Sequence, residues 1–178
     1  MEEKITNHIL DILNLYRTDY TKSLHVRAIA KLLSTSHVTL LPYLKKLEKN
    51  KILISRKVGK NKEYLVNHNN ILTKDYLALS EKLEAIKYLQ KNFLIKKVYQ
   101  HLINVNVQDA IVLFGSYAKN YATETSDIDL FYLGKLSENQ ILEIKKIGKI
   151  YGKEINIKTS TIKNFNERLI TGDTLLTW

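Results

Sequence analysis

The chain has 178 residues, of which 44% are hydrophobic and 26% charged, so it can bury a core and form one large domain or two small ones. It contains no cysteine, which excludes a disulfide framework, a thiol nucleophile and a zinc site with cysteine ligands. No apolar run is long enough to cross a membrane and no signal peptide is recognisable, so we expect a cytoplasmic protein without a membrane partner.

The net charge of +10 is unevenly distributed along the chain. Residues 1–70 hold 13 basic and 6 acidic side chains, an excess of +7, whereas residues 71–178 hold 15 and 12, an excess of +3. A basic surface suits a polyanionic partner, although it can also serve solubility alone. The asymmetry indicates two domains with different partners.

The first 70 residues show helical periodicity followed by strand-like runs. Apolar spacing predicts helices over about 3–17 and 26–33, and a third helix after the Ser34–Ser36 turn that carries Leu40, Leu44 and Leu47. Two strand-like runs, 52–57 and 63–66, are joined by residues 59–62. Pro42 implies that the third helix is kinked or starts near Leu41, because proline lacks the amide hydrogen and clashes with the preceding turn.

The segment HVRAIAKLL-STS-HVTLLPYLKKLEKNKILISRKVGKNKEYLV resembles the winged helix-turn-helix family of DNA-binding domains. The resemblance implies double-stranded DNA as a partner and a role in transcription regulation, with base contacts from the exposed start of the third helix. Candidates for those contacts are His37, Thr39 and Tyr43, and basic side chains that would meet DNA phosphates are Lys45, Lys46, Arg56, Lys57, Lys60 and Lys62. The alternative is that this basic cluster is only a solvated surface.

A long helix is predicted from Lys74 to about Ile103, with one break near Asn92. Its apolar residues recur at three- and four-residue steps, as in a coiled coil: Tyr76, Leu79, Leu83, Ile86 and Phe93. The helix either packs on its own domain or joins two copies in a homodimer.

Two short apolar runs enclose the most distinctive residues of the chain. The first, from Ile111, ends in Gly115-Ser116, and the second begins after Asp127 and ends at Leu133, so both are predicted as buried strands. On a strand Asp127 and Asp129 share one face, an arrangement that a hard cation such as Mg²⁺ or Mn²⁺ would neutralise. Lys119 either meets a phosphate or only solvates a loop.

The stretch LFGSYAKNYATETSDIDLF is similar to the minimal branch of the nucleotidyltransferase superfamily related to DNA polymerase beta, and the resemblance covers roughly residues 90–178. It implies that Asp127 and Asp129 hold a metal ion with a nucleoside triphosphate such as ATP, and that Gly115 and Ser116 bind its phosphates. It also implies that an acceptor hydroxyl attacks the α-phosphate, with a protein as one kind of acceptor.

Two positions depart from the pattern of that family. Asn120 stands where members usually have glycine, although asparagine also tolerates a left-handed backbone. The third family carboxylate aligns with Asn156 on the predicted strand 154–158, and Glu154 could replace it only in another register or rotamer. An asparagine can coordinate a metal but cannot act as a base.

The remaining predicted elements complete an α+β fold. They are a helix over 137–151 that Gly152 stops, the strand 154–158, a helix over 161–170, and a packed apolar tail with Leu175, Leu176 and Trp178. The expected architecture is an N-terminal winged helix of three helices plus a β-hairpin (1–70), a linker or dimerisation helix (71–93), and a small nucleotidyltransferase-like mixed sheet with flanking helices (94–178).

The expected function is that of a DNA-binding protein with a Mg-dependent nucleotidyltransferase domain. The intact Gly115-Ser116 and Asp127/Asp129 pairs favour retained nucleotide chemistry, whereas Asn120 and Asn156 favour decay. The first alternative is therefore a transcriptional regulator whose nucleotidyltransferase fold serves as a nucleotide sensor or interaction platform. The second is an antitoxin-like partner of a helical toxin protein.

Overall fold

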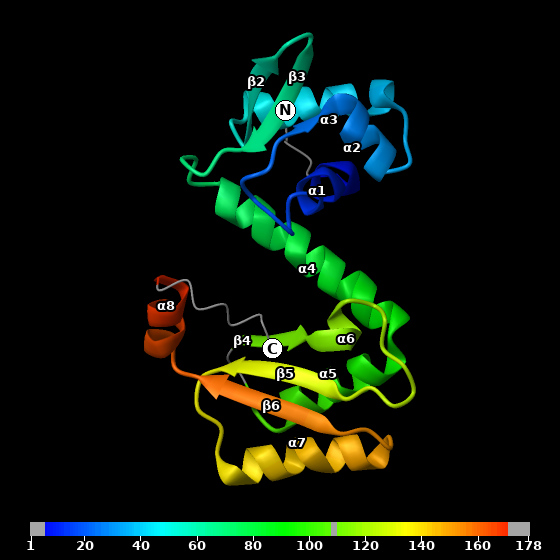
Figure 1. Cartoon of the computed structure of the whole chain (residues 1–178), viewed down its shortest axis with the longest axis vertical. Coiled ribbons are helices and arrows are strands. Elements are labelled where there is room, and N and C mark those ends of the chain that lie inside the picture. The colour runs from blue at the N-terminus through cyan, green and yellow to red at the C-terminus, as the bar shows by residue number, and fades with distance from the viewer. Residues whose placement is uncertain (1–5, 108–109, 171–178) are drawn as a thin grey trace. The chain divides into compact units, whose positions relative to one another are not determined.

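The computed structural model describes residues 6–107 and 110–170 of the chain. It divides into two compact units, Met1–Lys91 and Asn92–Trp178 (Figure 1). The predicted start of the first helix at Glu3 and the predicted packing of the tail with Leu175, Leu176 and Trp178 lie outside the described residues.

Three helices build most of the first unit: α1 (Asn7–Asn14), α2 (Val26–Leu32) and α3 (His37–Lys49). The apolar residues that recur at helical spacing are the buried ones, among them Ile12, Ile29 and Leu44. His25 Nδ1 caps α2 by accepting from the Ala28 amide (3.2 Å), and Ser36 caps α3 by accepting from the Thr39 amide (3.1 Å). The Ser36 cap fixes the start of α3 at His37, so a start near Leu41 is wrong and Pro42 lies inside the helix.

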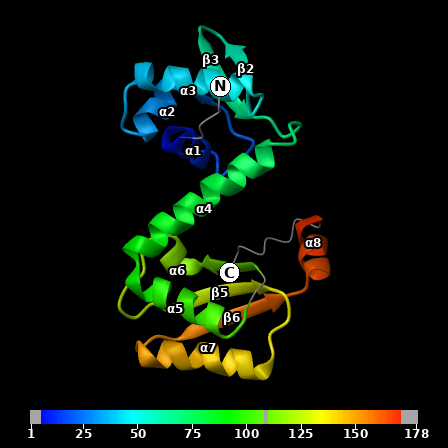
Figure 2. The ribbon, with the colours of Figure 1, turned by 180° about the vertical axis from the view of Figure 1, so that it is seen from behind.

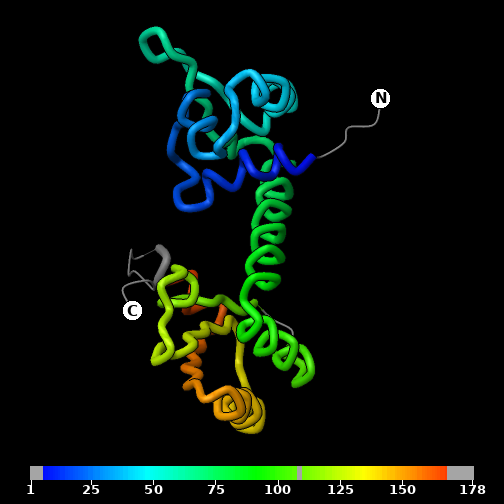
Figure 3. Tube along the Cα trace, turned by 90° about the vertical axis from the view of Figure 1, so that its right-hand side faces the viewer, coloured from blue at the N-terminus to red at the C-terminus, as the bar shows by residue number. Residues whose placement is uncertain are grey.

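A three-stranded antiparallel sheet in the order β1-β3-β2 completes this fold: β1 (Leu24–His25), β2 (Leu53–Val58) and β3 (Asn61–Val66). The loop of the hairpin is shorter than predicted, because Val58 pairs with Asn61 and leaves only Gly59 and Lys60 in the turn. Gly59 has φ +60°, which suits glycine. The hairpin extends away from the helices of its unit (Figure 3). Helices and sheet in this order form a winged helix, as predicted; only the two-residue β1 was not expected.

Helix α4 (Thr73–Lys91) follows the hairpin and belongs to the first unit, where it packs against α1. Ser80 Oγ donates to the Leu10 carbonyl (2.9 Å), and Lys87 Nζ pairs with Asp11 (2.9 Å). The predicted long helix and its break are confirmed, because α4 ends at Lys91, Asn92 leaves helical geometry, and α5 (Phe93–Asn104) begins directly afterwards.

The second unit contains a mixed sheet in the order β4-β5-β6: β4 (Ala110–Phe114), β5 (Ile128–Leu133) and β6 (Ile155–Ser160). β4 and β5 are antiparallel, whereas β5 and β6 are parallel and connected through α7 (Glu138–Ile150). A single helical turn, α6 (Gly115–Ala118), follows β4, and α8 (Ile162–Ile170) follows β6.

The two faces of this sheet have different surroundings. Ile128, Leu130 and Tyr132 of β5 are buried on the face that α5 and α7 cover, as the view from behind shows (Figure 2). Asp129 and Phe131 alternate with them and lie on the other face, where each is only half-buried. The expected α+β class and the small mixed sheet with flanking helices are therefore both present. Within residues 6–107 and 110–170, no helix combines the length and apolarity that crossing a bilayer requires.

Candidate functional site

Gly115 and Asp129 meet at the end of β4. Phe114 is the register partner of Asp129, so the turn that follows Phe114 starts beside this carboxylate. Gly115 has φ +69°, and a Cβ at this position would lie 2.2 Å from Asp129 Oδ2. Both the backbone conformation and the lack of space therefore require glycine. The arrangement places the Gly115-Ser116 turn and the carboxylate of Asp129 in one site.

Asp127 and Asp129 lie on either side of a buried residue of β5, Ile128. Ile128 is fully buried, whereas Asp127 is exposed and Asp129 is half-buried, which fits the alternation of a strand with one open face. Among the residues described by the structure, no group of three or more histidine or acidic side chains is arranged to hold a metal ion. The protein ligands available for a cation here are thus two carboxylates.

Asn156 is the residue that stands beside Asp129 on the neighbouring strand. The parallel register pairs Asp129 with Asn156, and Asn156 Nδ2 donates to Asp129 Oδ1 (3.3 Å). Glu154 precedes β6, its carbonyl accepts from the Ile128 amide (2.9 Å), and the residue is exposed. The amide of Asn156, and not the carboxylate of Glu154, therefore occupies the place next to Asp129.

The loop between α6 and β5 is held by a residue that the sequence did not single out. Lys153 Nζ donates to the carbonyls of Thr123 (3.3 Å) and Glu124, and lies 6.0 Å from the centroid of the Tyr117 ring. Asn120 adopts φ +59°, so it supplies the left-handed conformation expected at this position. Lys119, also a candidate for phosphate binding, ends α6 and is exposed.

The residues exposed on the outward face of α3 are not the same as the residues predicted to contact DNA bases. His37 and Thr39 are exposed, but Tyr43 is half-buried and packs against the core and the His8 ring (4.8 Å between centroids). Opposite the buried leucines, the exposed residues are Val38, Pro42, Lys45 and Lys49. Val38, which is 64% exposed, was missed. Counting 3.6 residues per turn from Leu40, Leu44 and Leu47 would have placed it on this face.

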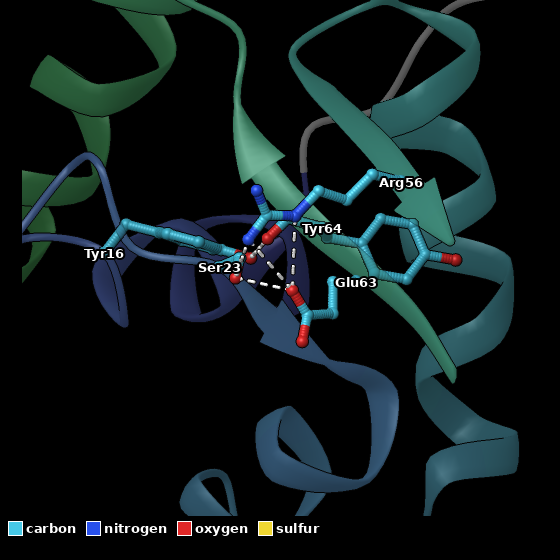
Figure 4. A network of polar contacts seen from close by, with 5 residues as sticks. All are labelled: Tyr16, Ser23, Arg56, Glu63 and Tyr64. Carbon is cyan, nitrogen blue, oxygen red and sulfur yellow. Dashed lines mark hydrogen bonds and ion pairs between the residues drawn. The ribbon is translucent and has the colours of Figure 1, made fainter. Parts of the chain in front are cut away.

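Two of the side chains predicted to bind DNA phosphates form ion pairs with acidic residues of the same unit. Arg56 bonds to Glu63 Oε2 (3.3 Å) and to Ser23 Oγ (3.1 Å), which also donates to Glu63 (2.7 Å), as Figure 4 shows. The bond from Ser23, with that from Arg56, lowers the pKa of the Glu63 carboxyl. This network joins β2 and β3 to the residue before β1.

Lys62 forms the second engaged pair, with Glu48 of α3 (2.7 Å). This hydrogen bond raises the pKa of Lys62 and, with one from Ser55 (2.5 Å), lowers the pKa of Glu48. Lys57 and Lys60 are exposed near the hairpin tip, and no ion pair within the described part of the chain involves them. The other two candidates also lie on α3, where Lys45 is exposed and Lys46 half-buried.

Residues 95–174 match the family model of the nucleotidyltransferase domain. This segment is a nucleotidyltransferase domain. The site around Gly115, Asp127 and Asp129 lies within it, whereas α1 to α4 lie outside the match. No curated protein matches the chain.

Among solved structures, the chain is similar to the adhesin competence repressor AdcR of Streptococcus pyogenes, with 22% identity over 53% of this chain and 68% of that chain and a TM-score of 0.44. It is also similar to MepR, a transcription regulator of the Staphylococcus aureus efflux pump MepA, with 20% identity over 57% and 79% of the two chains and a TM-score of 0.40. Because these similarities are low, the winged-helix assignment rests on the topology of the first unit itself.

Proposed function

We propose that the protein binds double-stranded DNA through its winged helix and a nucleoside triphosphate through its nucleotidyltransferase domain, and transfers a nucleotidyl group to a hydroxyl acceptor. The observation that carries the nucleotide part is the contact between Gly115 and Asp129. A position that admits only glycine holds the Gly115-Ser116 turn directly beside a half-buried carboxylate, so a cation on that carboxylate and phosphates on the turn would be neighbours.

The residues of the site fit a Mg²⁺ ion, which commonly binds through one or two carboxylates together with substrate phosphates and water. Asp127 and Asp129 would hold it, and Mn²⁺ would suit the same oxygen ligands. The ion would stabilise the negative charge that develops on the phosphate oxygens. Gly115 and Ser116 would bind the terminal phosphates, with Lys119 as a further contact.

In the proposed transfer, the acceptor oxygen forms a bond to the α-phosphorus while the bond between that phosphorus and the pyrophosphate breaks. The acceptor proton passes to solvent, because the amide of Asn156 cannot accept it. General-base assistance typically contributes about two to four orders of magnitude in rate, so we expect slow turnover. The same observation favours the second candidate function, a DNA-binding regulator that senses a nucleotide without consuming it.

The direct test incubates the full chain with each labelled nucleoside triphosphate and Mg²⁺, in the presence of DNA, RNA or a protein extract. Retention of nucleotide and release of pyrophosphate are measured together. Pyrophosphate release that Asp127→Asn and Asp129→Asn both abolish would establish a transferase. Retention without release would establish the sensor, and the absence of both signals would refute the nucleotide proposal.

DNA binding is supported by the outward face of α3 and by the tip of the hairpin. Val38 and Pro42 offer apolar surface for thymine methyl groups, and Lys45 and Lys49 on the same face suit phosphates. Lys57 and Lys60 extend the positive charge to the hairpin. Binding to labelled duplex DNA over a range of salt concentrations tests this part, and salt-independent or undetectable binding would refute it.

We further propose that α4 joins two copies in a homodimer. Leu79 and Ile86 of α4 lie seven residues apart and are 43% and 54% exposed. Ser80 and Lys87, which contact α1, each follow one of these two residues by one position and so lie about 100° around the helix from this stripe. Apolar residues at heptad spacing are typical of helix–helix association.

A further inference from the structure

The face of the sheet that bears Asp129 carries polar and aromatic side chains at matched positions on all three strands. Facing the same side as Asp129 and Phe131 are, by register, Phe114 and Val112 on β4 and Asn156 and Lys158 on β6. Val112 is 49% exposed, in contrast to the buried residues of the opposite face. The Phe165 ring of α8 contacts Phe131 on this face (5.9 Å between centroids), so the residues next to Asp129 that a ligand could meet are those at the Phe114 and Asn156 level and Lys158.

Lys158 reaches across this surface toward the site. Its Nζ lies 6.0 Å from the centroid of the Phe114 ring, although Lys158 belongs to β6 and Phe114 to β4. β5 lies between those two strands, which places their backbones about 10 Å apart at the usual spacing of neighbouring strands. The Lys158 ammonium and the Phe114 ring therefore approach each other over β5, and Phe114 is the register partner of Asp129.

The site offers few positive charges for a triphosphate, and the Lys158 ammonium could supply one. At the level of Asp129, the neighbouring strand contributes the neutral amide of Asn156, so within residues 6–107 and 110–170 the carboxylates placed to hold a cation here are those of Asp127 and Asp129. A nucleoside triphosphate carries several negative charges that need positive partners. An ammonium group on a long flexible side chain is a common phosphate ligand, and it needs no metal ion to act.

We propose that Lys158 binds the triphosphate group of the nucleotide and supplies part of the positive charge that metal ions would otherwise provide. This inference rests on the proposed nucleotide site and names one further residue within it. It has a specific consequence. Part of the affinity for nucleotide persists without a divalent cation, and that part depends on Lys158.

The test measures equilibrium dialysis of labelled ATP, GTP, CTP and UTP against the full chain, once with Mg²⁺ and once with EDTA. Lys158→Met is compared with Lys145→Met, which removes the same charge from an exposed position on α7. We expect Lys158→Met to weaken binding about tenfold in both solutions, the effect of losing one charged hydrogen bond. Lys145→Met should bind like the wild type.

Two further measurements separate a ligand role from a structural one. Lys158→Arg keeps the charge and should restore most of the affinity, and inorganic tripolyphosphate should compete less well for Lys158→Met than for the wild type. Equal binding by Lys158→Met and Lys145→Met, while Asp127→Asn loses the Mg²⁺-dependent part, would refute the role of Lys158 and leave the nucleotide site intact. If the wild type bound no nucleotide at all, both proposals would fail.

Discussion

At the scale of single residues, the geometry around Asp129 decides what the nucleotidyltransferase domain can do. Its Oδ2 lies beside Gly115, and its Oδ1 accepts a hydrogen bond from the side-chain amide of Asn156. The sequence predicted that these residues belong to one site and which strands carry them. It could not predict which oxygen meets which neighbour, because that depends on the pairing of β5 with strands on both sides.

Gly115→Ala should abolish nucleotide binding, because the added methyl group would displace Asp129. Gly152→Ala is the matched control, since Gly152 also has a positive φ (+63°) but nothing within 4 Å of its Cβ position. Both variants should lose about 1–2 kcal/mol of stability from backbone strain, measured by urea unfolding. Nucleotide binding by Gly115→Ala equal to that of Gly152→Ala would contradict the account.

Asn156→Asp should make the stability of the domain depend on a divalent cation. The change replaces a donor to Asp129 by a second carboxylate, and two like charges in register repel one another. We expect a melting temperature lower by roughly 4 °C or more in EDTA, recovered when Mg²⁺ is added. Asn139→Asp, at an exposed position on α7, serves as the control. A melting temperature of Asn156→Asp that ignored Mg²⁺ would argue against a cation site here.

At the scale of secondary structure elements, the sequence predicted those parts of the winged helix that depend on neighbouring residues, such as apolar periodicity and helix caps. Helix α2, the Ser36 cap of α3 and the break at Asn92 lie where periodicity and turn residues predicted them, whereas the hairpin strands extend closer to the turn than predicted and α3 starts before Leu41. The strand β1 was missed because two residues carry no periodicity, and its pairing with β3 joins positions about forty residues apart. Pro42 fits inside α3 because it lies on the exposed side, away from the core.

The tip of the hairpin should contribute to DNA binding through Lys57 and Lys60. The double variant Lys57→Met/Lys60→Met should lower the dependence of log affinity on log salt concentration by about 2, since two phosphate contacts are lost. Lys74→Met/Lys82→Met removes equal charge from exposed positions on α4 and is the control. Equal slopes for the two double variants would mean that the hairpin does not contact DNA.

Glu48 should make the first unit less stable in acid. Its pKa is lowered by hydrogen bonds from Lys62 and Ser55, so the pair stabilises the fold above the ordinary pKa of a glutamate. This contribution is lost as the pH falls through the lowered pKa and Glu48 takes up a proton. Between about pH 7 and pH 3, the urea midpoint of Glu48→Gln should therefore fall less than that of the wild type. Asp75→Asn, at an exposed position in the first turn of α4, should behave like the wild type.

At the scale of the whole molecule, the chain joins a winged helix to a nucleotidyltransferase domain. The charge asymmetry, counted at residue 70, indicated two domains, whereas the chain divides into its two compact units between Lys91 and Asn92. The assignment of α4 to the first unit was not predictable from spacing, because its apolar residues suit packing within a domain and between copies equally well. The structure shows both a side packed on α1 and an exposed stripe.

The exposed stripe of α4 should control the oligomeric state. Leu79→Lys/Ile86→Lys should convert a dimer to a monomer in light-scattering chromatography, because burying two charged side chains in an apolar helix contact is costly. Ala78→Lys/Ala85→Lys changes exposed residues of the same helix outside the stripe and should leave the dimer intact. A wild-type chain that is monomeric at high concentration would exclude this dimer.

The most direct test of the account is the binding of labelled nucleoside triphosphates to the full chain as Mg²⁺ is added, compared between the wild type and Asp127→Asn. The account predicts that Mg²⁺ tightens binding to the wild type and leaves binding to Asp127→Asn unchanged, with both proteins folded. Binding that responded to Mg²⁺ equally in the two proteins would contradict the assignment of Asp127 and Asp129 as the centre of the site.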